Sequence, residues 1–135
     1  MAATALDGAA LAAKIRAGVR DEVAELGEIG LATVLVGEDH ASQIYIRLKH
    51  QAADEAGIRA VDRRLPEETT EEELLEVVEE LNADDSIDGI LVQTPLPPQI
   101  EEARVMRALD PNRDRRFPAA LDFMHDLTQA ARPAH

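Results

Sequence analysis

The feature that most constrains the fold of this chain is an alternation of two hydrophobic periods along it. Four segments have apolar residues at every third or fourth position, which predicts helices, and they are residues 6–26, 39–56, 70–81 and 100–109. Three shorter runs between them have the pattern of strands, and they are residues 31–36, 58–65 and 89–93. Because helix and strand alternate, we expect an α/β fold with three layers, a mostly parallel sheet and helices on both of its faces.

Residues that begin and end regular structure mark the same borders. Gly57 follows the second helical segment, and Thr70 with Glu73 three positions later has the pattern of a capping box that opens the third. Residues 31–36 are almost all apolar, which is typical of a parallel strand buried on both faces. With 135 residues and 2% aromatics, the chain has room for one domain with an aliphatic core.

Charge and composition exclude several classes of function. A net charge of −13 repels phosphate backbones, so no nucleic-acid partner is expected. No apolar run is long enough to cross a bilayer and the N-terminus lacks a signal-peptide pattern, so we expect a cytoplasmic protein without a membrane partner. The absence of cysteine excludes disulfides and thiolate metal sites. His40 and His50 are too exposed by pattern, and too poorly partnered, to predict a metal site.

The basic residues single out one lysine. Of the 14 Lys and Arg residues only Lys14 and Lys49 are lysine, the basic side chain that can lose its proton near neutral pH. Lys14 lies in a charged helical segment, so Lys49 is the better candidate for chemistry. Tyr45 lies four positions earlier on the same helix face, and Gln93 ends the third predicted strand. Ligands of parallel sheets bind at the carboxyl ends of strands, so Tyr45, Lys49 and Gln93 are expected to converge on one cleft.

The same residues also have structural interpretations. Tyr45 and Lys49 have the spacing of an ordinary solvated helix surface. Gln93 could cap backbone groups at the strand end, and Pro95 could open a connection that is merely stiff. The sequence contains no Gly-rich loop of the phosphate-binding type, so this chain is not expected to bind a nucleotide cofactor by itself.

Three stretches of sequence carry a resemblance to one family. Residues 41–49, Ala-Ser-Gln-Ile-Tyr-Ile-Arg-Leu-Lys, lead to Glu-Ala-Gly-Ile at residues 55–58. Residues 88–97 read Asp-Gly-Ile-Leu-Val-Gln-Thr-Pro-Leu-Pro, and residues 110–114 read Asp-Pro-Asn-Arg-Asp. In this order and spacing, the stretches resemble the folate-binding catalytic domain of the bifunctional methylenetetrahydrofolate dehydrogenase/methenyltetrahydrofolate cyclohydrolase family. The match covers about residues 4–114.

The resemblance implies a multifunctional enzyme of one-carbon metabolism that acts on tetrahydrofolate derivatives and supports purine biosynthesis. One implied activity oxidises methylenetetrahydrofolate to the methenyl form by hydride transfer to NADP. The other hydrolyses the methenyl form to formyltetrahydrofolate and needs no nucleotide. The family binds NADP in a second domain, which the resemblance does not cover, so only the hydrolytic cyclohydrolase step is expected of this chain alone. The family's homodimers likewise form largely through that second domain.

The resemblance also implies roles for individual residues. Lys49 would act as the general acid and base that activates water and moves the proton at the folate nitrogen. Tyr45 would stack on the folate ring, and Gln93 would hydrogen-bond Lys49 and tune it. A lysine base needs partial desolvation without a carboxylate partner, and a neutral amide beside it serves that end. The residues implied to contact substrate are Ser42, Tyr45, Gln93, Pro95 and Leu96.

The last part of the chain departs from the family. Arg116 stands where the family has the Asp that grips the pterin ring, and an arginine cannot accept the ring's N–H donors. We therefore expect a tetrahydrofolate-binding catalytic domain at residues 1–114 and a divergent tail at residues 115–135, without a Rossmann domain. Two alternatives to a cyclohydrolase stay open, namely a catalytically inactive folate-binding or interaction module and a truncated remnant.

Overall fold

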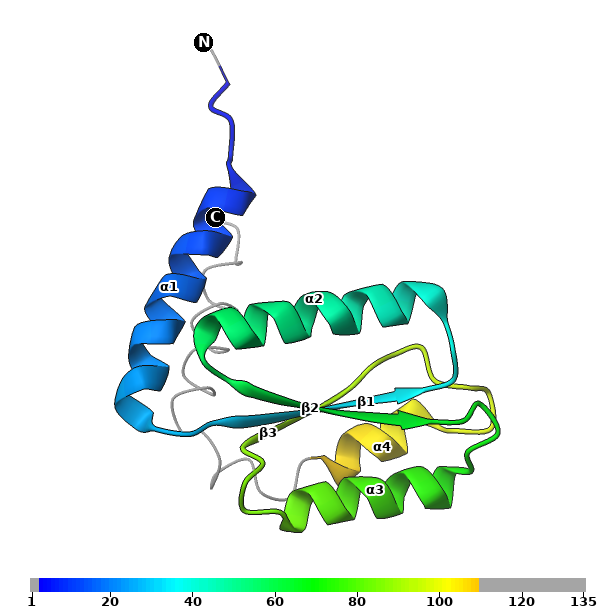
Figure 1. The fold of residues 1–135 in the computed structure, drawn as a ribbon. Helices are drawn as coiled ribbons and strands as arrows, with labels where there is room; N and C mark the ends of the chain where they lie inside the picture. Colours follow the sequence, from blue (N-terminus) through cyan, green and yellow to red (C-terminus); the bar gives the residue numbers. More distant parts are fainter. Residues whose placement is uncertain (1–2, 110–135) are drawn as a thin grey trace, which may run out of the picture.

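The computed structural model describes residues 3–109, which form helices and strands in the predicted order (Figure 1). The helices are α1 (Gly8–Leu26), α2 (His40–Ala56), α3 (Glu71–Ala83) and α4 (Glu102–Ala108). The strands are β1 (Gly30–Val36), β2 (Arg59–Leu65) and β3 (Gly89–Val92). Every predicted element is present, and the expected capping box of α3 forms reciprocally between Thr70 and Glu73. Gly57 ends α2 in the left-handed conformation, with φ of 79°, which glycine adopts without strain.

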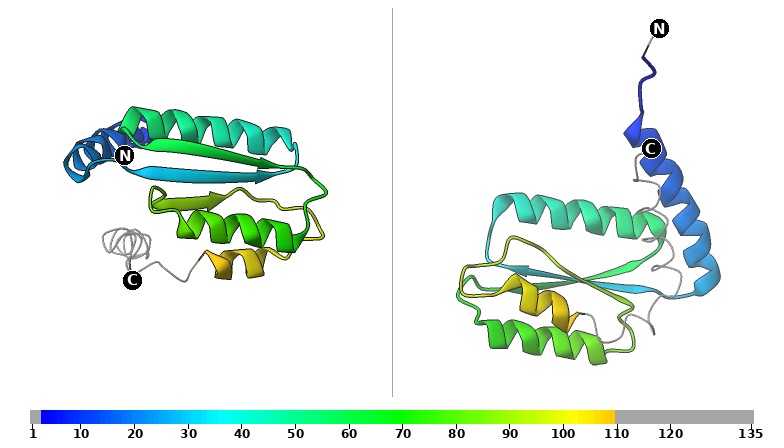
Figure 2. Two further views of the ribbon diagram at one scale, coloured as in Figure 1. Left: turned by 60° about the horizontal axis from the view of Figure 1, so that its bottom comes forward. Right: turned by 180° about the vertical axis from the view of Figure 1, so that it is seen from behind.

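The strands form an all-parallel sheet with the order β2-β1-β3. Thr33, at the centre of β1, is in register with Asp62 of β2 on one side and with Leu91 of β3 on the other. Helix α2 lies on one face of the sheet, whereas α3 and α4 cover the other face, as Figure 2 shows from two further directions. The predicted three-layer α/β fold is therefore confirmed.

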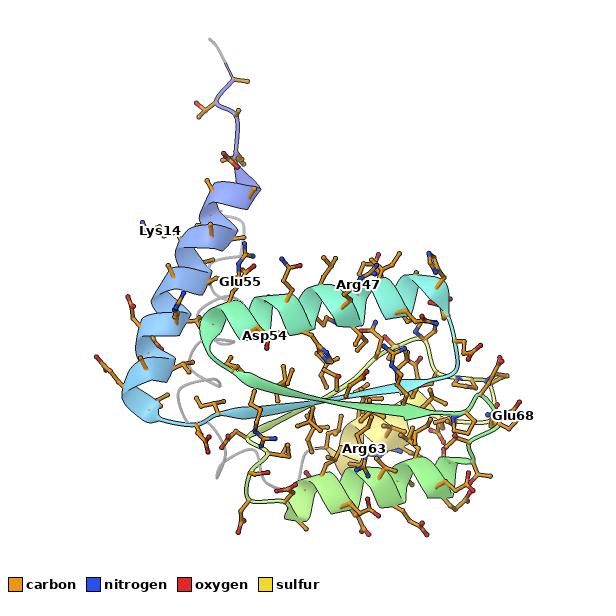
Figure 3. All side chains as sticks on the ribbon, in the orientation of Figure 1. Lys14, Arg47, Asp54, Glu55, Arg63 and Glu68 are labelled. Atoms are coloured by element: carbon orange, nitrogen blue, oxygen red, sulfur yellow. The ribbon has the colours of Figure 1, made fainter. Side chains whose placement is uncertain are left out.

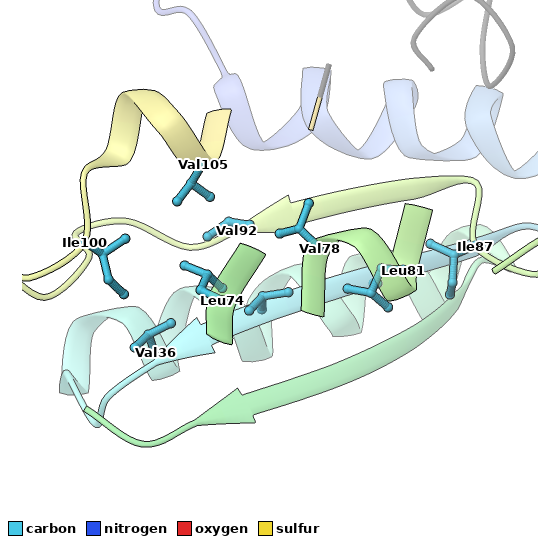
Figure 4. Close-up of a cluster of buried hydrophobic side chains, with 10 residues drawn as sticks. Val36, Leu74, Val78, Leu81, Ile87, Val92, Ile100 and Val105 are labelled. Atoms are coloured by element: carbon cyan, nitrogen blue, oxygen red, sulfur yellow. The ribbon is translucent and has the colours of Figure 1, made fainter. Parts of the chain in front are cut away.

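The main core lies between the sheet and the layer formed by α3 and α4. Because side chains alternate along a strand, Ala32, Val34 and Val36 of β1 all face this side. They meet Leu74 and Val78 of α3, which are both 0% exposed (Figure 4). Full burial of such a side chain contributes roughly 1.5–3 kcal/mol, so this aliphatic layer holds the domain together.

A smaller core lies on the opposite face, under α2. Leu35 of β1 points to this side, and Ile46 of α2 is buried there beside two small residues, Ala53 and Ala56. Small side chains on the buried face allow α2 to lie close to β1 and β2, the strands that it packs against. This close approach matters for the site, because α2 carries Lys49.

Helix α1 is anchored mainly at its C-terminal half. Its buried residue is Val23, and an ion pair of 3.6 Å between Arg16 Nε and Glu55 Oε2 joins it to α2. Figure 3 shows α1 extending past the sheet, next to the end of α2 that carries Glu55. A row of large apolar side chains on α1 is exposed, and it consists of Leu11, Ile15, Val19 and Leu26. The helical period is thus predicted correctly, but described residues cover little of its apolar face.

Within residues 3–109, no helix combines the length and the apolar character that a membrane span requires. Three parts of the sequence discussed above lie outside the described residues. They are the resembling stretch at residues 110–114, Arg116 and the tail at residues 115–135.

Candidate active site

Gln93 lies directly after β3, at the carboxyl edge of the sheet. Its backbone N–H donates to the carbonyl oxygen of Val34 at 2.9 Å, so the ladder with β1 extends one residue past the strand. Val92 faces the main core, and the alternation of side chains therefore turns Gln93 to the face on which α2 lies. Its Nε2 donates to the carbonyl oxygen of Thr94 at 2.9 Å, and the residue is only 8% exposed. The amide is thus held with Oε1 available as an acceptor.

Lys49 reaches this acceptor from the middle of α2. Helical side chains slant toward the helix N-terminus, which here means toward the carboxyl edge of the sheet. Nζ of Lys49 donates to Oε1 of Gln93 at 2.8 Å, and Lys49 takes part in no ion pair with the other described residues. The residue is nevertheless exposed, so the described residues alone do not supply the partial desolvation that a lysine base needs. Lys49 lies on the flank of α2, next to the buried face and not on it.

The other expected contact residues lie close to this pair along the chain. Tyr45, one turn before Lys49 on the same face of α2, is 55% exposed, so its ring is open to a ligand. Pro95 is exposed and Leu96 is half-buried in the segment that leaves Gln93, with a cis peptide bond between Thr94 and Pro95. Tyr45, Lys49 and Gln93 therefore share one region, and Pro95 and Leu96 follow directly from it.

Ser42, which is also expected to contact substrate, is buried in the first turn of α2. It is 1% exposed, and its backbone N–H donates to Oδ2 of Asp39 at 2.8 Å, which caps α2. Hydrogen bonds from the backbone and side chain of Ser42 lower the pKa of Asp39 below its ordinary value. The serine thus orders the first turn of α2, and its hydroxyl is not open to solvent.

A polar contact beside the site was missed by sequence reasoning. Nε2 of His50 lies 2.7 Å from Oγ1 of Thr33, and His50 is half-buried. The expectation that His50 is exposed and poorly partnered is therefore wrong. The helical spacing of His50 from Ile46, a buried residue four positions earlier, is the signal that places it on the inner face of α2.

Neither a metal nor a dinucleotide fits the described residues. In residues 3–109, no three His, Asp or Glu side chains come together as a metal site requires. The pyrophosphate of NADP needs free N–H groups at a helix start. The carboxylate of Asp39 occupies the start of α2, and Thr70 with Glu73 occupies that of α3. The backbone N–H of Glu101, before α4, donates to Oε1 of Glu71. These anionic caps repel phosphate, so the donor set does not suit NADP.

Comparison with known proteins supports the resemblance. Residues 6–115 match the family described as tetrahydrofolate dehydrogenase/cyclohydrolase, catalytic domain. Bifunctional protein FolD 3 of Rhizorhabdus wittichii is 53% identical over 114 residues, which cover 81% of this chain and 38% of the relative. Bifunctional protein FolD 2 of Geobacter sulfurreducens is 52% identical over 116 residues, with 83% and 41% covered. The chain spans about two fifths of the length of these curated relatives.

Solved structures of the same kind share the fold. The 5,10-methylenetetrahydrofolate dehydrogenase of the silkworm Bombyx mori has a TM-score of 0.78 at 40% identity, over 82% of this chain and 40% of that one. The Trypanosoma brucei dehydrogenase-cyclohydrolase, solved with NADP cofactor and inhibitor, has a TM-score of 0.77 at 36% identity, over 83% of this chain and 40% of that one. This chain therefore belongs to the tetrahydrofolate dehydrogenase/cyclohydrolase family and carries its catalytic domain.

Proposed function

We propose that this domain binds tetrahydrofolate derivatives and hydrolyses methenyltetrahydrofolate to formyltetrahydrofolate. The observation that carries the proposal is the contact between Lys49 Nζ and Gln93 Oε1, which holds an amine without a carboxylate partner at the carboxyl edge of the sheet. The relatives' names, which describe bifunctional FolD proteins and methylenetetrahydrofolate dehydrogenases, support folates as the substrate class. We do not assign hydride transfer to the described residues, because their helix starts do not suit NADP.

The hydrolysis requires a base and then an acid at the same place. The methenyl carbon of the substrate joins two folate nitrogens in a cation. Neutral Lys49 accepts a proton from water while the water oxygen bonds to this carbon, and it returns a proton to the nitrogen whose bond to the carbon breaks. The formyl group stays on the other nitrogen, and one proton is released overall. Gln93 orients the amine without adding a negative charge that would hold the proton on it.

Substrate binding supplies the desolvation of Lys49 that the domain does not provide by itself. Lys49 is exposed, so its desolvation has to come from the molecule bound over it. The exposed ring of Tyr45 offers a flat surface for stacking with the planar folate ring. Pro95 and Leu96 add apolar surface beside Gln93, and Ser42 contributes indirectly by ordering the start of α2.

The two lysines of the chain provide a matched test. The absorbance decay of methenyltetrahydrofolate is measured with the wild type, with Lys49→Ala and with Lys14→Ala, each against buffer. Lys14 lies on exposed α1, so its removal changes the charge equally without touching the site (Figure 3). We expect acceleration by the wild type and by Lys14→Ala, and a loss of about 100-fold or more in Lys49→Ala, as for removal of a general base.

The other results have definite meanings. A wild-type decay equal to that in buffer refutes the catalytic proposal. Folate binding measured by fluorescence or calorimetry then separates an inactive folate-binding module from a remnant, because only the module binds. Equal activity in Lys49→Ala and the wild type refutes the role of Lys49 while leaving hydrolysis by the domain in place.

A further inference from the structure

We propose that Thr33 and His50 form a positioning pair that fixes α2 on the sheet and thereby places Lys49 against Gln93. This inference rests on the proposed function, in which the Lys49 amine does the chemistry. Among the described residues, no hydrogen bond joins the side chain of Thr33 or His50 to Tyr45, Lys49 or Gln93, so both would act through the position of Lys49.

The contact joins the buried centre of the sheet to a half-buried residue of α2. Thr33 is 0% exposed in β1, the middle strand, where an unpaired hydroxyl would be costly. Its Oγ1 lies 2.7 Å from Nε2 of His50, and farther from Oδ1 of Asp62 at 3.4 Å and from the carbonyl oxygen of Val61 at 3.5 Å. His50 is therefore the nearest partner of the only polar side chain of β1.

The apolar contacts of α2 do not fix its position by themselves. The buried side chains on its inner face are Ile46 and the small residues Ser42, Ala53 and Ala56. Small side chains allow a helix to approach closely but provide few interlocking surfaces against sliding. A hydrogen bond of 2.7 Å is directional, so the contact between Thr33 and His50 opposes sliding of α2 along the sheet.

Lys49 and His50 are adjacent in the helix, so the two polar contacts work together. His50 contacts Thr33 on the central strand β1, and Lys49, in the same turn of α2, donates to Gln93 directly after the end of β3. Both contacts start from adjacent residues of one helix, so a shift of the helix backbone displaces both side chains together. Loss of the contact between Thr33 and His50 should therefore release the Lys49 amine.

Four variants separate the hydrogen bond from the volume of the side chains. His50→Leu and Thr33→Val remove the bond while keeping similar size. His50→Gln and Thr33→Ser keep a polar atom where the bond needs one. Val78→Ala is the control, because it destabilises the domain from the opposite face of the sheet. Unfolding curves define conditions in which every variant is folded, and if His50→Leu does not fold, Thr33→Val carries the test.

The first measurement does not depend on catalysis. Trace acetylation with acetic anhydride, read by peptide mass spectrometry, reports the reactivity of Lys49 relative to Lys14, the other lysine of the chain. We expect this ratio to rise about threefold or more in His50→Leu and Thr33→Val, the factor that follows from loss of an ordinary hydrogen bond. The ratio stays near the wild type in His50→Gln, Thr33→Ser and Val78→Ala.

The second measurement is the rate of methenyltetrahydrofolate hydrolysis. We expect kcat to fall between about 10- and 100-fold in the bond-removing variants with little change in KM, because misplacement of a reacting group by about 1 Å has effects of this size. An unchanged acetylation ratio in folded His50→Leu and Thr33→Val overturns the positioning role. If the wild type does not hydrolyse the substrate, the proposed function fails, and the acetylation ratio alone still decides the positioning role.

Discussion

Replacing Leu74 by alanine tests the assignment of the main core to the side of α3 and α4, and Leu11→Ala provides a matched control. Both leucines lie in helices, so the intrinsic helix propensity changes by about the same amount in each variant. Leu74 is 0% exposed, whereas Leu11 is 58% exposed on α1. The two variants therefore differ mainly in the burial of the side chain that is removed.

The difference in burial sets the expected loss in the free energy of unfolding for each variant. Leu74→Ala removes about three buried carbon groups, and at roughly 0.8 kcal/mol each the lost transfer free energy is about 2.4 kcal/mol. The cavity that remains adds to this value, so we expect a total loss of about 3–4 kcal/mol in the free energy of unfolding. Leu11→Ala should cost less than about 1 kcal/mol, because much of its side chain already contacts water. The loss at Leu74 is a large part of a typical stability of about 5–15 kcal/mol.

Urea unfolding followed by circular dichroism at a helical wavelength measures both values. The midpoints should differ clearly while the slopes stay equal, which shows that the two variants unfold from the same compact state. A cost for Leu11→Ala as large as that for Leu74→Ala would refute the reasoning from exposure. It would mean that the apolar row on α1 is covered in solution.

Four other substitutions test local features of the fold. Thr70→Ala removes one half of the capping box and should lower the free energy of unfolding by about 1 kcal/mol, measured by thermal melting. Gly30→Ala should destabilise by about 1–3 kcal/mol, because its Cβ would lie 2.0 Å from the carbonyl oxygen of Ser86. In the same assay Gly18→Ala should stabilise α1 by about 0.5–1 kcal/mol, since nothing lies within 4 Å of the added Cβ. The pKa of Asp39 is lowered by folding, so its contribution is present at neutral pH and is lost as the pH falls through the folded-state pKa. Unfolding curves of Asp39→Asn should therefore show a weaker loss of stability in acid, and an unchanged acid dependence would contradict the role of the cap.

The fold could be predicted because its determinants are local. The period of apolar residues, Gly57 and the capping box at Thr70 each act within a few positions, and the alternation of helix and strand then limits the topology. The order of the strands does not follow from such signals. It depends on which edge of β1 each crossover reaches, and the sequence pattern is the same for both edges.

The candidate site could be predicted only in part. Helix spacing and strand ends predict that Tyr45, Lys49 and Gln93 lie together, and the structure brings Lys49 and Gln93 into contact. The exposure of Lys49 and the partner of His50 depend on how far α2 stands from the sheet, a distance that local patterns do not contain. The catalytic roles themselves stay predictions until the lysine variants are measured.

The arrangement of the strands has a consequence for the order of assembly. Thr33 and Asp62, which link β1 to β2, are 29 positions apart, whereas Gly30 and Asp88, at the junction of β1 and β3, are 58 apart. Closing the longer stretch of chain costs about 0.6 kcal/mol more in chain entropy. Strand β3 has 4 residues and β2 has 7, so β3 forms fewer backbone hydrogen bonds with β1 than β2 does. We therefore expect β1, α2 and β2 to form an early unit and β3 to dock late. Gln93 arrives with β3, so the proposed hydrolytic activity should disappear at lower denaturant concentration than the helical circular-dichroism signal of the domain.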